Sequence, residues 1–157
     1  HTPEVLLLDE PTNGVDPVSR RDFWRILYSL QKEGVTLLVS TSYLDEAERC
    51  GRVGLIHHGR LVASGTPAAL KSQMPGALLE VRTNQVRRSA LVLREAFPSW
   101  TVGLFGDRVH AAVPEAVAGQ RDLESALKAR GFPWESVKAI PPSLEDLFLA
   151  LLKEEAA

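Results

Sequence analysis

Four consecutive apolar residues, 5–8, run directly into two carboxylates and a proline, which are Asp9, Glu10 and Pro11. An unbroken apolar run of this kind is typical of a strand that is covered on both faces, because no position alternates toward water. Proline ends such a strand, since it has no N–H to donate to a sheet ladder. The run therefore predicts a central strand of a buried sheet.

A helix and a second apolar run follow this strand. Asp16 and Pro17 have the pattern of a helix N-cap and a first helical residue, and Gly34 is a typical helix stop. The apolar positions between them recur with helical spacing and are Phe23, Ile26, Leu27 and Leu30. Residues 35–39 form the next apolar run, and the order strand, helix, strand predicts a parallel sheet and an α/β fold class.

The rest of the chain predicts a short acidic helix at 44–49, a hairpin at 52–63 and a helix at 68–73. A Met-Pro-Gly break at 74–76 then separates two expected domains, 1–76 and 77–157. The elements expected in the second domain are strand 78–82, helix 86–97, strands 100–104 and 108–113, a helix closed by Gly131, strand 134–140 and a final helix with a capping box at 143–146. The order βαββαβ predicts a small α+β, ferredoxin-like accessory domain. The apolar stripe of the final helix is expected to pack on its own domain, with a partner subunit as the alternative.

Composition disfavours several classes of function. Eighteen Lys and Arg residues against twenty Asp and Glu residues give a net charge of −2, so no excess of positive charge favours nucleic acid. Cys50 is the only cysteine, which rules out an internal disulfide and suits the reducing cytoplasm. The longest apolar run, 147–152, is far shorter than the roughly 20 residues of a membrane-spanning helix. Because the chain opens on His1 and reaches a buried-strand pattern at once, we expect the front of a larger domain to precede it.

The carboxylates after the first strand are candidates for chemistry. Open α/β sheets bind ligands at the carboxyl ends of their parallel strands, where side chains and loops converge. Asp9 offers the oxygen ligands that Mg²⁺ prefers, and Glu10 is placed to orient and deprotonate a water that attacks phosphorus.

Residues 6–17, Leu-Leu-Leu-Asp-Glu-Pro-Thr-Asn-Gly-Val-Asp-Pro, resemble the Walker B motif and D-loop of ABC transporter ATPase subunits. The resemblance implies that Asp9 supports Mg²⁺ through water, that Glu10 is the catalytic base and that Asp16 reaches across a dimer of ATPase domains toward nucleotide. From the residues alone Asp16 is a helix N-cap, and the two roles are compatible.

The likeness continues beyond this motif. The family has a switch loop of threonine and histidine at the position of Thr41 and Ser42, so Thr41 is implied to bind nucleotide and serine replaces the switch histidine. Serine is shorter than imidazole and does not titrate near neutrality, which puts hydrolysis at this site in question. Further matching segments are 45–48, 59–60, 65–67 and 142–148, the last of which resembles the C-terminal signature of subunits that serve ABC-2 type exporters.

The resemblance implies the rear portion of an ABC-type P-loop ATPase domain in residues 1–76. The expected function of the intact subunit is to couple ATP binding and hydrolysis, with Mg²⁺, to export through a membrane permease. The implied partners are that permease and a second ATPase domain, as a homodimer or a tandem half, with no nucleic acid. The implied location is cytoplasmic, peripheral on the inner face of the membrane through the permease. The sequence contains no G-x-x-x-x-G-K-[ST] phosphate loop, so this chain alone is expected to be inactive.

Two other interpretations compete with an ATPase. Ser42 favours a non-catalytic module for dimerisation and permease coupling, or a degenerate ATPase half. A phosphoacceptor receiver domain ranks last, because a further acidic strand end and a lysine strand end are not found.

Other polar side chains are expected to be structural. His57 and His58 fit a hairpin tip better than a metal site, and His110 is expected to point to solvent from a half-buried strand. The doublets 20–21 and 87–88 are expected to be solvated helix faces.

Overall fold

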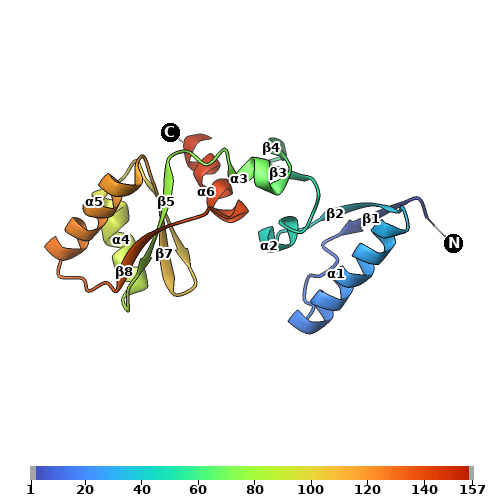
Figure 1. Ribbon diagram of the computed structural model, residues 1–157, viewed down its shortest axis with the longest axis horizontal. Helices are drawn as coiled ribbons and strands as arrows, with labels where there is room; N and C mark the ends of the chain where they lie inside the picture. The colour runs from blue at the N-terminus through green and yellow to red at the C-terminus, as the bar shows by residue number, and fades with distance from the viewer. Residues whose placement is uncertain (1–2, 156–157) are drawn as a thin grey trace. The chain divides into compact units, whose positions relative to one another are not determined.

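The computed structural model describes residues 3–155, and the chain forms two compact units, 1–47 and 48–157 (Figure 1). Both units combine helices with sheets, so the chain is a mixed α/β protein, which confirms the fold class at that level. The domain boundary predicted at residue 76 lies inside the second unit and stays a prediction. Among the described residues, no helix combines the length and the apolar character that crossing a membrane requires.

The first unit contains β1 (Val5–Asp9), α1 (Pro17–Lys32), β2 (Thr36–Ser40) and the short α2 (Leu44–Ala47). The two strands pair in parallel, as expected from the strand–helix–strand order, and α1 lies along them (Figure 1). The first turn of α1 is capped as predicted, because Asp16 Oδ1 accepts hydrogen bonds from the backbone N–H groups of Val18 at 2.9 Å and Ser19 at 3.1 Å.

One face of the β1–β2 sheet is open within this unit. Val5, Leu7 and Leu38 are 55%, 68% and 65% exposed, so the expectation of a strand covered on both faces is not met here. The reason is that α1 is the one long helix in the described part of the unit, and a single helix covers a single face. The buried side of that helix consists of Trp24 and Leu27, whereas Ile26, expected on the same side, is exposed.

The second unit begins with a hairpin and a short helix. Its first elements are β3 (Val53–His57), β4 (Arg60–Gly65) and α3 (Pro67–Lys71). The turn between the strands consists of His58 and Gly59, both with positive φ (45° and 75°), which matches the right-handed twist of the hairpin. These elements confirm the predicted hairpin and the predicted helix. Thr66 caps the helix, because its Oγ1 accepts from the N–H of Ala69 at 3.2 Å.

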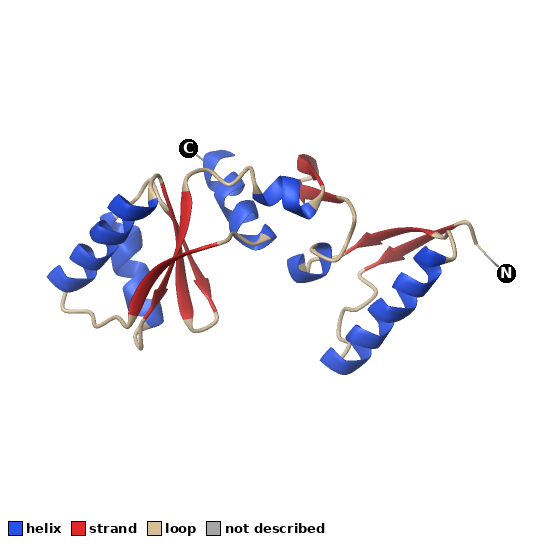
Figure 2. Ribbon diagram, in the orientation of Figure 1, coloured by secondary structure: helices blue, strands red, loops and turns tan. Residues whose placement is uncertain are grey.

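A four-stranded antiparallel sheet forms the rest of the second unit, with the strand order β6-β7-β5-β8. The remaining elements are β5 (Ala77–Arg82), α4 (Val86–Ala96), β6 (Thr101–Phe105), β7 (Arg108–Val113), α5 (Ala116–Ala129), β8 (Ser136–Ile140) and α6 (Leu144–Glu155). Helices α4 and α5 cover one face of this sheet and α6 lies against the other (Figure 2). The main core lies between the sheet and helices α4 and α5, where Leu93, Leu123 and Leu127 are completely buried.

The final helix packs within its own unit, as preferred from the sequence. Leu144 and Leu147 are completely buried against the chain itself. The predicted capping box is present, because Asp146 Oδ2 accepts from the backbone N–H of Ser143 at 2.9 Å and the Asp146 N–H donates to Ser143 Oγ at 3.2 Å. Glu48 adds a second carboxylate at this end of the helix, since its Oε1 accepts from the Leu144 N–H at 2.9 Å.

The prediction that His110 points to solvent is wrong. Its side chain is 13% exposed, and its Nδ1 lies 2.8 Å from Asp146 Oδ1 while its ring stacks on Phe105. His110 lies on the face of β7 that the strand alternation predicts, but α6 covers that face. Glu80 belongs to the same face and is clamped by Arg82 at 3.0 Å and Arg108 at 2.7 Å.

Candidate functional site

Two polar residues meet where the parallel strands of the first unit end. Asp9 is the last residue of β1 and lies in register with Ser40, the last residue of β2. The Ser40 hydroxyl donates a hydrogen bond to Asp9 Oδ1. Both residues are exposed, so their oxygen atoms are accessible at the carboxyl edge of the strand pair.

Glu10 has an unusual backbone conformation. Its φ is +43°, in the left-handed region that costs a residue with a side chain on the order of 1–3 kcal/mol. Hydrogen bonds hold it there, because its N–H donates to the Ser40 carbonyl at 3.0 Å and its own carbonyl accepts from the N–H of Asn13 at 3.1 Å. Strained residues that are held in this way cluster at functional sites.

The side chain of Glu10 faces the loop after β2. Ser42 Oγ donates to Glu10 Oε2 at 3.3 Å, which joins the loops that follow the two strands. The contact is exposed and at the long end of the range for hydrogen bonds between oxygen atoms, so it contributes little on its own. Of the predicted site residues, Asp9, Glu10 and Ser42 therefore lie at one edge of the sheet.

A buried carboxylate lies beneath these loops. Glu46, on α2, has no exposed surface, and its two oxygens accept hydrogen bonds from Thr12 Oγ1 at 2.7 Å and Thr41 Oγ1 at 3.1 Å. Arg20 Nε lies 3.5 Å from Glu46 Oε1, and the guanidinium carbon of Arg20 lies 4.4 Å from the centre of the Tyr43 ring. The prediction that Arg20 belongs to a solvated helix face is therefore wrong.

The other two predicted site residues have partners of their own. Thr41 Oγ1 donates to Glu46 and accepts from the N–H of Tyr43 at 3.1 Å. Asp16 binds the first turn of α1, and hydrogen bonds from Ser19, through its side chain and its backbone, lower the pKa of the Asp16 carboxyl. Within residues 3–155, no group of three or more His, Cys, Asp or Glu side chains is arranged to hold a metal ion.

Sequence patterns alone do not indicate that Glu46, Thr12 and Ser40 belong to this site. The pairing of Asp9 with Ser40 follows from the register of two parallel strands, which apolar patterning alone does not give. Glu46 lies in an acidic stretch, 45–48, that is typical of an exposed helix. Glu46 differs from its neighbours in being faced by two hydroxyl residues, Thr41 five positions before it and Thr12 far away in the sequence.

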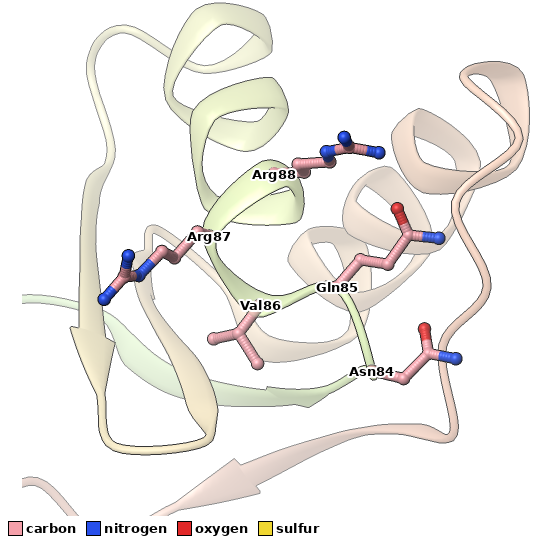
Figure 3. Close-up of a pocket in the computed structure, with 5 residues that line it drawn as sticks. All are labelled: Asn84, Gln85, Val86, Arg87 and Arg88. Atoms are coloured by element: carbon pink, nitrogen blue, oxygen red, sulfur yellow. The ribbon is translucent and has the colours of Figure 1, made fainter.

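A shallow hollow in the second unit does not form a comparable site. Residues 84–88 line it where α4 begins. Figure 3 shows that the side chains of Arg87 and Arg88 point in different directions, so the two cations do not converge on one ligand position. This doublet retains its interpretation as a solvated helix face.

The chain is similar to several known proteins, although no family model matches it. The probable multidrug ABC transporter ATP-binding protein YbhF of Escherichia coli (strain K12) is 55% identical over 73 residues, which are 46% of this chain and 13% of that protein. The daunorubicin resistance ATP-binding protein DrrA2 of Streptomyces coeruleorubidus is 36% identical over 154 residues, 95% of this chain and 48% of that protein. The Nod factor export ATP-binding protein I of Sinorhizobium fredii (strain NBRC 101917 / NGR234) is 35% identical over 156 residues, 98% of this chain and 43% of that protein. The chain spans less than half the length of each of these relatives.

Proposed function

We propose that this chain, whose homologues over most of its length are ABC transporter ATP-binding proteins, is part of a subunit that couples ATP binding and hydrolysis to export through a membrane permease. The observation that carries the proposal is the meeting of Asp9, Glu10 and Ser42 at the carboxyl edge of two parallel strands, the edge at which such sheets bind ligands. The same proposal gives the subunit a cytoplasmic, membrane-peripheral location through the permease.

The donor set at this edge fits Mg²⁺. Asp9 and Ser40 offer a carboxylate and a hydroxyl oxygen, and Mg²⁺ is usually bound through one or two carboxylates together with waters and substrate phosphates. These two residues would hold the ion, directly or through water. When bound, Mg²⁺ neutralises negative charge on the phosphate oxygens of ATP.

Glu10 then acts as the general base. Its carboxylate accepts the proton of the water that attacks the terminal phosphorus, and its strained backbone fixes where that carboxylate lies. Ser42 restrains Glu10 Oε2 by a hydrogen bond but carries no group that titrates near neutral pH. Asp16 lies at the start of α1, from which we propose that it contacts a second ATPase domain, in a homodimer or a tandem half.

The finer fold assignment belongs to the same proposal. The order β6-β7-β5-β8 with α4 and α5 on one face supports a ferredoxin-like accessory domain in residues 77–157. The parallel pairing of β1 with β2 supports an ABC-type ATPase sheet in residues 1–76.

The test is Glu10→Gln in the complete ATP-binding protein that contains this chain, with Glu33→Gln at the exposed end of α1 as the matched control. Loss of the base should lower ATP turnover by about 100-fold or more, while ATP binding is retained. The control should hydrolyse ATP like the unmodified protein. Equal turnover in both variants would contradict the proposed role of Glu10.

A second candidate function is a degenerate, mainly nucleotide-binding half, and the specific observation that favours it is Ser42 in place of histidine. Ser42→His in the complete protein separates the two, with Ser29→His on the exposed surface of α1 as control. A gain in turnover of about tenfold or more would show a degenerate site. No gain would show that serine suffices or that a partner supplies the group.

A further inference from the structure

We propose that Glu46 is a positioning residue that holds the loop of Glu10 and the loop of Ser42 in fixed relation. Its carboxylate binds Thr12, two residues after Glu10, and Thr41, the residue before Ser42. The inference rests on the proposed function, because it assigns to Glu46 the geometry of the proposed base. Glu46 acts on the loops of Glu10 and Ser42 through its bonds to the two threonines.

The carboxylate of Glu46 is completely buried, which costs free energy that its partners must offset. A carboxylate taken out of water loses several kcal/mol of hydration, which good partners must offset. Each oxygen of Glu46 has a hydroxyl donor, and Thr12 is as deeply buried as Glu46 itself, with 1% and 0% exposure. Arg20 supplies a positive charge at 3.5 Å.

The hydrogen bond between Glu10 and Ser42 is too weak to fix the two loops by itself. Its two oxygens are 3.3 Å apart and exposed, so water competes for both groups. The bond between Thr12 and Glu46 is 2.7 Å long and buried, where leaving a partner unsatisfied is expensive. The two threonine bonds to Glu46, one buried and one partly buried, therefore set the distance between the loops, and the exposed bond between Glu10 and Ser42 follows from it.

The chain contains a matched control two residues away. Glu48 is also a partly buried glutamate with two defined partners, because it binds Lys71 Nζ at 2.9 Å and the N–H of Leu144 at 2.9 Å. Neither partner belongs to the loops that follow β1 and β2. Glu48→Gln therefore perturbs a carboxylate in the same stretch of sequence and leaves the two loops joined.

The first test measures ATP turnover in the complete protein, divided by the number of ATP-binding sites so that unfolded protein is not counted. Glu46→Ala should lower turnover per site by about tenfold or more, because both threonine bonds are lost. Glu46→Gln should recover most of it, since an amide of the same shape accepts from Thr12 and donates to Thr41. Glu48→Gln should retain full turnover. Unchanged turnover per site in Glu46→Ala, or no recovery in Glu46→Gln, would overturn the proposal.

The second test does not depend on ATP hydrolysis and uses the 157-residue chain. Amide hydrogen exchange at Glu10 and Tyr43 reports the two loops, and Glu46→Ala should accelerate it by about tenfold relative to Glu48→Gln. If Glu46→Ala does not fold, Thr12→Val removes one of the two bonds to Glu46 and takes no acceptor from the Glu10 or Tyr43 N–H, so it should show a smaller acceleration. Unchanged exchange would refute the link between the loops. Accelerated exchange in a complete protein that does not hydrolyse ATP would instead refute the proposed function alone.

Discussion

Gly76→Ala tests the junction between the hairpin region and the four-stranded sheet. Gly76 has φ of +70° and precedes β5, whose first residue pairs with Val113 on β7. A Cβ at position 76 would lie 2.1 Å from the carbonyl oxygen of Val113 and 3.0 Å from that of Pro114. Both atoms belong to the backbone, so neither can rotate away without moving the strand.

The magnitude has two parts. The left-handed backbone costs alanine roughly 1–2 kcal/mol. Forcing an atom into a packed site costs roughly a further 1–3 kcal/mol, because the β5–β7 ladder must shift. Gly131→Ala isolates the first part, since Gly131 has φ of +71° and nothing lies within 4 Å of the added Cβ. We expect a loss of about 2–5 kcal/mol for Gly76→Ala and about 1–2 kcal/mol for Gly131→Ala.

Urea unfolding followed by tryptophan fluorescence measures both variants. Trp100 and Trp134 pack against the core of the second unit, and a Trp24→Phe background removes the signal of the first unit. The change in unfolding free energy of each variant is compared with that background. Equal losses for Gly76→Ala and Gly131→Ala would refute the steric argument, because the two positions differ in the clash and share the backbone conformation.

Three further outcomes are expected for stability and solubility. Burial raises the pKa of the Glu80 and Asp146 carboxyls, but hydrogen bonds lower each pKa by more. Arg82 and Arg108 bind Glu80, and His110 and Ser143 bind Asp146, so both pKa values lie below their ordinary ones. Their stabilisation is therefore present at neutral pH and should be lost as pH falls from about 5 through 4 and below, which urea midpoints at several pH values will show. Leu147→Ala should lower the unfolding free energy of the second unit by about 2–5 kcal/mol, since Leu147 is completely buried. Leu149→Ala should lower it much less, because Leu149 is 36% exposed. Equal losses in the two variants would contradict this. Leu7→Lys on the open face of the β1–β2 sheet should raise the concentration at which the chain aggregates, measured by light scattering, and no change would show that this face does not drive association.

Local patterns predicted most of the elements. The helix start at Asp16–Pro17, the hairpin turn at His58–Gly59 and the capping box at Ser143 are each specified by a few neighbouring residues, and each is present. The boundaries shift by one to several residues, as in the short α2, which ends at Ala47 where the sequence suggested residue 49. Local patterns determine that an element exists more firmly than where it begins and ends, because element ends fray by one or two residues.

The predictions that failed depend on residues that are distant in the sequence. His110 alternates correctly along β7, but whether its face meets water is decided by α6, which begins more than thirty residues later. Arg20 has the surroundings of a solvated helix residue, and its burial is decided by Glu46 and Tyr43. Sequence patterning predicts which side chains share one face of a helix or strand. Which other element covers that face depends on the whole fold.

Glu10 is the position at which local preference and the proposed function conflict. Its φ of +43° favours glycine or asparagine, so a chain selected for stability alone has no reason to place a glutamate there. Backbone strain of this kind is found where a side chain is functional, and the turn at Glu10 directs its carboxylate toward the loop of Ser42. This is why Glu10→Gln is the sharper variant than Glu10→Gly. Glutamine keeps the backbone strain and the side-chain size and removes the charge, whereas glycine removes all three at once. A loss of turnover in Glu10→Gln can then be assigned to the carboxylate itself.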